Sequence, residues 1–277
     1  MRRWYSGASM TEIDIVGVGV WSEYFSDWDE FCSVLAGGAI PQVAALKPEL
    51  IAANERRRAP LFVKMAVEVM DQACRMGALE PSEVATVFAS VYGDMQITDY
   101  MCRTLDAAPR TISPTRFHNS VHNASTGYWA IATQSQRPAN AISAYLHSAP
   151  MALLEGAIQA LEEDIPVLVC VQELASPATI KPIYDSEQSF STALLLTPPA
   201  HCASPLASLR IGVSSEKSEF PEAPEIPGVD WSHNLGARFV PLLAALATAR
   251  DTELQLPLSK RSSLAVSLKR NTGKANA

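Results

Sequence analysis

The sequence has little of what a nucleic-acid-binding or membrane-spanning chain needs. Its 22 lysines and arginines are outnumbered by 29 aspartates and glutamates, for a formal net charge of −7. Surfaces for nucleic acid or anionic membranes need clustered positive charge, and the one basic run, 56–58, is short. We expect this run to be a solvated helix start that holds nearby carboxylates. No apolar run is long enough for export or for a membrane span.

Cysteine is also scarce, and its spacing excludes two common roles. The five cysteines are odd in number and widely separated, at Cys32, Cys74, Cys102, Cys170 and Cys202. Neither a disulfide framework nor a CxxC metal site is indicated. We therefore expect a cytoplasmic protein that binds no metal and no other cofactor.

The sequence also lacks the complete glycine pattern of a dinucleotide-binding loop. The run IDIVGVGV, residues 13–20, contains Gly17 and Gly19, but the third glycine of the dinucleotide fingerprint is missing. The β-branched residues predict a buried strand, and the glycines indicate an exit turn where another backbone comes close.

Apolar periodicity predicts a mixed α/β domain. Hydrophobic residues make up 48% of the 277 residues, enough for a sizeable core. Two strands without a helix between them, 189–198 and 208–215, are expected to be antiparallel neighbours. The last helix is expected to be interrupted early by Pro241. The other expected strands are 13–20, 84–91, 140–144, 165–173 and a closing hairpin over 253–268, and the expected helices are 62–76, 95–105, 151–163 and 239–249.

We expect one domain over residues 11–270. The Glu- and Pro-rich stretch 216–230 has no period and is expected to be a surface loop. Residues 1–10 and 271–277 are expected to be disordered ends.

The most unusual segment is SPTRFHNSVHNASTGYW, residues 113–129. His118 and His122 would share a helical face, as two metal ligands do, but the segment has no carboxylate or cysteine to complete a site. We expect structural histidines that bond to Asn119, Asn123 or backbone groups.

A serine hydrolase would place its nucleophile on a GxSxG turn between a strand and a helix. The corresponding stretch here, 141–151, contains His147 and Ser148 but no glycine. Adjacent residues point in different directions, so His147 is poorly placed to act as the base for Ser148.

Several ordered motifs resemble the β-ketoacyl synthases, which have the thiolase fold. Ser113-Pro114, Asn123, Gly127 and Pro138 follow the order and spacing around the synthase nucleophile. ERRRAP, FASVYGD and residues 113–129 are similar to segments of the synthase-like N-terminal domain proteins that serve as chain-length factors in aryl polyene biosynthesis.

The resemblance implies a fold without the chemistry. The nucleophilic cysteine position falls on Leu146, or on His147 if the register shifts by one. The C-terminal half of a synthase, with its two histidines, is largely missing from this sequence. Acyl transfer and decarboxylative condensation need that Cys-His-His set, so we expect no catalytic residue in this chain.

The resemblance also implies a partner, a catalytic ketosynthase, in a heterodimer or a higher assembly that contacts an acyl carrier protein transiently. The loop around Phe117 would cross the interface and close the partner's acyl tunnel. Two alternatives remain open: a stand-alone acyl-thioester enzyme using Ser148 or His147, and a purely structural scaffold partner. The residues expected to shape the tunnel or the interface are Thr115, Arg116, Phe117, His118, Val121, Asn123, Gly127 and Trp129.

Overall fold

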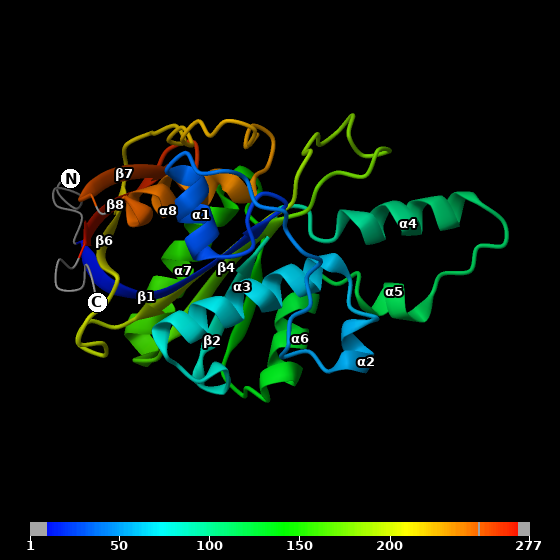
Figure 1. Ribbon diagram of the computed structural model, residues 1–277, viewed down its shortest axis with the longest axis horizontal. Helices are drawn as coiled ribbons and strands as arrows, with labels where there is room; N and C mark the ends of the chain where they lie inside the picture. The colour runs from blue at the N-terminus through cyan, green and yellow to red at the C-terminus, as the bar shows by residue number, and fades with distance from the viewer. Residues whose placement is uncertain (1–9, 249, 271–277) are drawn as a thin grey trace, which may run out of the picture.

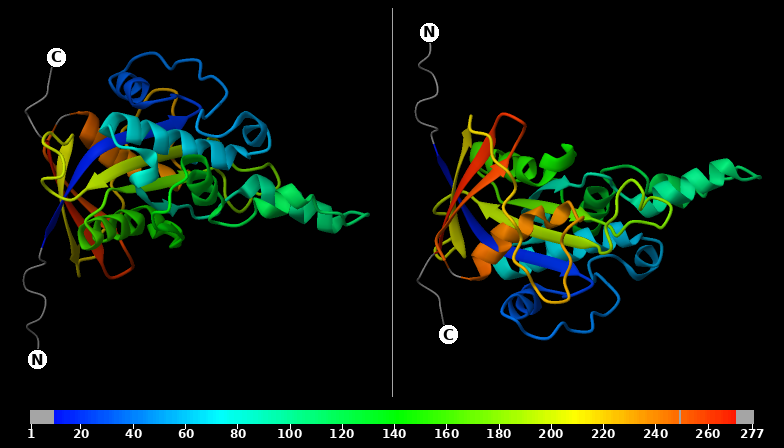
Figure 2. Two further views of the ribbon diagram at one scale, coloured as in Figure 1. Left: turned by 90° about the horizontal axis from the view of Figure 1, so that it is seen from below. Right: turned by 90° about the horizontal axis from the view of Figure 1, so that it is seen from above.

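The computed structural model describes residues 10–248 and 250–270. The expected disordered ends, 1–10 and 271–277, therefore lie outside the described residues except for Met10. One mixed sheet with the strand order β3-β2-β4-β5-β1-β6-β8-β7 forms the middle layer. Helices cover both of its faces (Figure 1, Figure 2). The expected mixed α/β architecture is confirmed.

The strands follow the apolar runs of the sequence closely. Their bounds are β1 Thr11–Ser22, β2 Ala85–Ala89, β3 Ala139–Ile142, β4 Val167–Glu173, β5 Phe190–Thr197, β6 Ala207–Ser214, β7 Thr252–Pro257 and β8 Ser263–Arg270. β2 pairs in parallel with β3 and β4. All other pairs are antiparallel.

One topological prediction is wrong. β5 and β6 are not neighbours, because each pairs with β1 and β1 lies between them. Since both are antiparallel to β1, they run in the same direction. The connection between them crosses β1, and the periodicity of two isolated strands cannot reveal that.

The helices form two layers. Their bounds are α1 Trp28–Leu35, α2 Ala53–Arg56, α3 Leu61–Gly77, α4 Met95–Asp106, α5 Pro114–His118, α6 Ala124–Thr133, α7 Ser148–Glu163 and α8 Val240–Ala247, with 3-10 turns η1 Pro81–Glu83, η2 Tyr145–His147 and η3 Gly236–Phe239. α7 and α8 share a hydrophobic core on one sheet face. α3 and α6 share the core on the other face.

The position of Pro241 differs from expectation. Pro241 lies in the first turn of α8 and so begins this helix instead of interrupting it. A proline lacks the N–H group, which has no helical partner at this position in any case.

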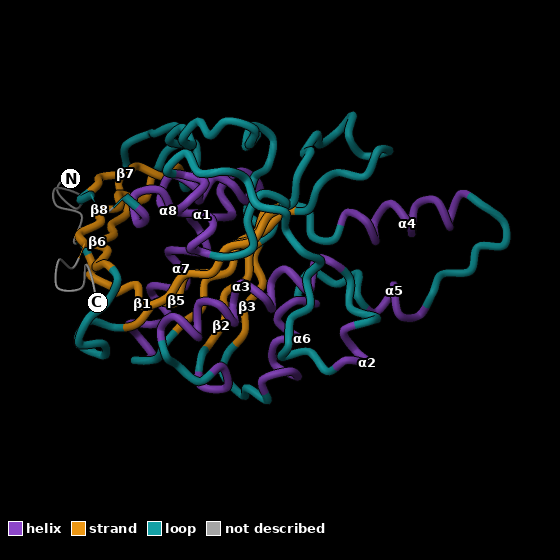
Figure 3. The backbone as a smooth tube through the Cα atoms, in the orientation of Figure 1, coloured by secondary structure: helices purple, strands orange, loops and turns teal. Residues whose placement is uncertain are grey.

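α4 and the loop that leads to α5 extend away from the body of the molecule (Figure 1, Figure 2). Residues 216–230 contain only an isolated bridge between Ile226 and Val229 and run as a loop (Figure 3). Within the described residues, no helix has both the length and the apolar character needed to cross a bilayer.

The two glycines of β1 allow the backbone of helix α3 to approach this strand closely. A Cβ atom added to Gly17 would lie 2.0 Å from the Ala73 carbonyl oxygen, and one added to Gly19 would lie 1.9 Å from the Val69 carbonyl oxygen. The expected close approach of another backbone is confirmed, but it occurs inside the strand and not at an exit turn. The GxG pair therefore serves helix packing.

A buried carboxyl at the end of β4 holds the turn after β2. Glu173 is 1% exposed and accepts hydrogen bonds from the Ser90 hydroxyl at 3.1 Å and from the N–H groups of Val91 and, at 3.4 Å, Tyr92. None of the ion pairs among the described residues includes Glu173. Burial raises the pKa of this carboxyl to about 8, against the three donors, which lower it.

The glycine contact predicts a large and specific stability effect. Gly19→Ala should destabilise the protein by at least about 2 kcal/mol in urea unfolding, because the methyl group meets backbone that cannot move aside. Gly127→Ala is the matched control. An added Cβ there meets no atom within 4 Å, and alanine in a helix gains roughly 0.5–1 kcal/mol over glycine. Equal stabilities of the two variants would contradict the packing role.

Glu173 predicts a pH-dependent difference between the wild type and Glu173→Gln. The folded-state pKa of about 8 lies above the ordinary 4.5, so the contribution of this group to stability is fully present below pH 4.5 and is lost as the pH rises toward 8. As the pH rises from 5 to 8, the free energy of unfolding of the wild type should fall relative to that of Glu173→Gln, by roughly 2 to 4 kcal/mol in total. Thermal unfolding of both proteins across this pH range measures the difference. A constant difference across this range would show that Glu173 does not take up a proton on folding.

Candidate functional site

The turn between β3 and α7 is where the resemblance places a nucleophile. Tyr145 in this turn has a φ of 51°, in the left-handed region that side chains other than glycine rarely adopt. Leu146 and His147 complete the 3-10 turn η2, and α7 begins at Ser148. The strained turn is present, and none of its residues is a cysteine.

Ser148 and His147 are each committed to other partners. The Ser148 hydroxyl accepts from the Ala144 N–H at 2.9 Å and donates to the Tyr145 carbonyl at 2.8 Å. The His147 Nδ1 lies 3.0 Å from the Pro257 carbonyl oxygen and must carry the proton there, because a carbonyl only accepts. No hydrogen bond joins His147 to Ser148 in the described part of the chain. This pair therefore has the geometry of a structural cap and not that of a nucleophile with its base.

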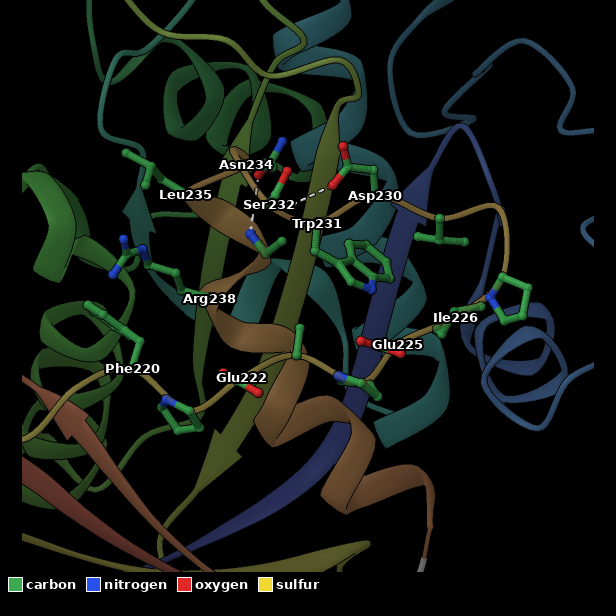
Figure 4. Close-up of a pocket in the computed structure, with 16 residues that line it drawn as sticks. Phe220, Glu222, Glu225, Ile226, Asp230, Trp231, Ser232, Asn234, Leu235 and Arg238 are labelled. Atoms are coloured by element: carbon green, nitrogen blue, oxygen red, sulfur yellow. Dashed lines mark hydrogen bonds between the residues drawn. The ribbon is translucent and has the colours of Figure 1, made fainter.

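A cavity of about 910 Å³ lies between the 216–230 loop and the segment that follows it. Figure 4 shows Arg238 and Phe220 together at one end of it, Ile226 at the other, and Trp231 between them. The Arg238 guanidinium lies 3.9 Å above the Phe220 ring, which also stacks with His147 at 6.1 Å. Through Phe220, the 216–230 loop contacts the turn after β3.

A second cavity, which we call the α5–α6 groove, gathers much of the predicted site. Its volume is about 760 Å³, and its walls come from α5, α6 and the chain around α2. Leu50, Ile51 and Tyr128 contribute to its lining. The predicted site residues that the groove brings together are Thr115, His118, Val121, Asn123 and Gly127.

The remaining predicted residues lie elsewhere. Phe117 is 62% exposed and is not among the residues that line the groove. The Arg116 guanidinium lies 4.0 Å above the ring of Tyr100, on the side of α5 toward α4. Trp129 is 1% exposed and packs with α3 in the core of this chain, so its ring cannot contact a partner as predicted. Its role is to anchor α6.

The two histidines of the segment differ in environment. The His122 Nε2 lies 2.9 Å from the Ser90 carbonyl oxygen, and its ring meets Phe88 edge-on at 5.9 Å. His118 is exposed on the groove wall. Among residues 10–248 and 250–270, no group of at least three His, Cys, Asp or Glu side chains could hold a metal ion.

Sequence reasoning missed several residues near this site. Glu173 ends a fully buried strand that is apolar from Val167 to Val171, and a lone acid in that place is a signal for a buried hydrogen-bonded carboxyl. The amphipathic pattern of α4 does not distinguish Tyr100 from its neighbours, although the Tyr100 hydroxyl accepts a hydrogen bond from the Ser113 N–H at 3.0 Å. Nothing in the sequence marks the left-handed backbone of Tyr145.

Comparisons with known proteins agree with this geometry. The family model described as "Beta-ketoacyl synthase, N-terminal domain" matches residues 28–236. No curated protein sequence matches the chain. Among solved structures, the chain is similar to one of the ketosynthase ApeO in complex with its chain length factor ApeC from Xenorhabdus doucetiae, at 20% identity and a TM-score of 0.66, with 93% of this chain and 99% of that chain covered.

Two other solved structures extend the comparison. The ishigamide ketosynthase/chain length factor gives 14% identity and a TM-score of 0.71, covering 94% of this chain and 99% of that one. A β-ketoacyl synthase from Burkholderia phymatum STM815 gives 14% identity and a TM-score of 0.59, covering 77% of this chain and 67% of that one. These likenesses show the thiolase-like ketosynthase fold. Because the family match spans more than half of the 277 residues, this chain belongs to the family of β-ketoacyl synthase N-terminal domains.

Proposed function

We propose that this chain is a non-catalytic, chain-length-factor-like subunit. It pairs with an active ketosynthase and shapes the acyl tunnel of that enzyme during fatty-acid-like elongation of a polyene or polyketide chain. The turn after β3 carries the proposal, because by resemblance the cysteine position of a synthase falls on Leu146 or His147 of this turn. The Ser148 hydroxyl does not replace the missing thiol, since both of its hydrogen bonds stabilise the turn.

The exposed apolar surface supports a protein partner. Large hydrophobic side chains stand out on α4, α5, α6 and the residues near them: Leu105 is 50% exposed, Phe117 62%, Val121 52% and Ile131 80%. Nearby in the sheet, β3 is an edge strand whose residues are exposed or half-buried. An apolar surface beside an unpaired strand edge is typical of a protein interface.

Phe117 is held in a way that suits a tunnel-closing role. Arg116, next to it, stacks on Tyr100, and the Ser120 hydroxyl donates to the Phe117 carbonyl at 2.8 Å. The Tyr100 hydroxyl also binds the Ser113 N–H, at the start of α5. The backbone of α5 is thus fixed on both sides of an outward-facing ring. A fixed bulky ring can limit chain length, because each methylene it excludes is worth roughly 0.8 kcal/mol.

We further propose a cytoplasmic protein without a cofactor, whose residues 11–270 act as one domain. The net charge of −7 offers no broad basic surface to a carrier protein, which is usually acidic. The acyl carrier protein should therefore make its transient contacts mainly with the catalytic ketosynthase.

Purification alone and with the cognate ketosynthase tests the pairing. The two chains should elute together with a mass of one copy of each or a multiple, and this chain alone should turn over no acyl thioester. A stable monomer that does not bind the synthase would contradict the proposal, as would turnover of an acyl thioester by the isolated chain. A synthase that is equally active and makes products of the same length without this chain would favour a structural scaffold.

Changing the volume of residue 117 tests the tunnel-closing role. Phe117→Ala should lengthen the products of the reconstituted pair by about one or two extension units, and Phe117→Trp should shorten them, as measured by mass spectrometry. Ile158→Ala is the control, because Ile158 is 49% exposed on α7, which packs on the sheet face opposite α3 and α6. Unchanged product lengths for both Phe117 variants would remove this role.

A further inference from the structure

A cleft between α4 and the body of the molecule has an unbalanced charge. We call it the arginine cleft; its volume is about 730 Å³, and Arg58, Tyr100 and Arg116 are among its lining residues. Arg58, Thr115 and Asn119 line both this cleft and the α5–α6 groove, so the two cavities are neighbours across α5. Helices α4 and α5, which contribute lining residues to the cleft, lie in the part of the fold near α2 (Figure 1).

Two arginines of the cleft lack a carboxylate partner. Arg103 is paired with Asp99 at 2.9 Å, and Asp99 also accepts from the Thr179 hydroxyl. Among the described residues, neither Arg58 nor Arg116 forms an ion pair. The Arg116 guanidinium stacks on the Tyr100 ring.

One acidic residue at the cleft does not balance them. Asp94 caps α4 by accepting from the Ile97 N–H at 3.0 Å, and its second oxygen has no hydrogen-bond partner. Burial raises the pKa of this carboxyl, while Arg116 acts in the opposite direction. Beside the Arg103–Asp99 pair, the cleft therefore has one carboxyl, Asp94, and two guanidinium groups that form no ion pair among the described residues, in a chain whose net charge is −7.

Asn119 adds an unmet requirement for a donor. Its residue is 3% exposed, and its side-chain oxygen has no hydrogen-bond partner. A buried acceptor without a donor costs free energy, and such groups are rare in folded proteins. The oxygen itself is buried, so the cleft presents its guanidinium groups, and not this amide oxygen, to an incoming group.

We propose that the arginine cleft receives a segment of the partner ketosynthase that carries an acidic side chain. The carboxylate accepts hydrogen bonds from Arg58 and Arg116, the two arginines of the cleft that form no ion pair among the described residues. The inference rests on the proposed heterodimer. A protein segment fits because the cleft adjoins the exposed apolar residues of α4, α5 and α6, which one partner can cover together.

Neighbouring residues of the ERRRAP motif supply a matched test. Arg58→Glu places a negative charge in the cleft, whereas Arg57→Glu places the same charge on an exposed neighbour outside both cavities. Binding to the cognate ketosynthase is measured for the full chain at low and high salt. Arg58→Glu and Arg116→Glu should each weaken binding at least tenfold, and Arg57→Glu less than threefold. The salt dependence of Kd should be shallower for Arg58→Glu than for the wild type.

A complementary change on the partner locates the carboxylate. Acidic surface residues of the ketosynthase are changed singly to lysine, and one of these variants should restore binding to Arg58→Glu. Thermal unfolding checks that Arg58→Glu folds as the wild type does, which is expected because its side chain is exposed and makes no ion pair.

Each other outcome overturns the inference in a distinguishable way. Equal losses from Arg57→Glu and Arg58→Glu would indicate a general charge effect, and no loss would show that the cleft is not contacted. Both results would leave the heterodimer itself intact. Failure of the wild type to bind the ketosynthase would overturn the heterodimer and the cleft assignment together. Self-association that Arg58→Glu abolishes, with ketosynthase binding unchanged, would make a second copy of this chain the occupant.

Discussion

The contact between α3 and β1 determines where the candidate site lies. Because Gly17 and Gly19 have no side chain, the backbone of α3 rests directly on the strand. Trp129 of α6 then packs in the same core as α3. The α5–α6 groove lies between α6 and the chain that leads into α3. A side chain on either glycine would push α3 outward and change the spacing of every element that lines the groove.

The turn after β3 has a strained backbone that side-chain hydrogen bonds hold in place. The left-handed backbone of Tyr145 costs free energy, so the surrounding contacts must hold it. Two hydrogen bonds of the Ser148 hydroxyl do so from within the turn, and the bond of His147 to the Pro257 carbonyl holds it from outside. Folding therefore requires the cap at the start of α7, whereas a cysteine would be required only for catalysis.

Local patterns predicted most of the elements, and long-range features escaped them. Apolar runs gave β4 and β5 to within one or two residues, because both strands are buried along their whole length. The separation of β5 from β6 by β1 depends on how distant strands pair, which no window of sequence contains. In the candidate site, the turn could be placed by resemblance. The burial of Trp129 could not, because it depends on the packing of α6 against α3.

The ERRRAP motif illustrates how one run of charge divides into separate roles. The Arg56 guanidinium donates to the carbonyls of Lys47 and Pro48 at 3.1 Å and closes the loop before α2. Arg57 and Arg58 are both exposed, but only Arg58 lines the two adjoining cavities. A solvated helix start would leave all three arginines in similar surroundings. An ion pair between a guanidinium and a carboxylate contributes little free energy at an open surface and more in a desolvated site. Arg57 and Arg58 therefore differ in whether a partner could desolvate them.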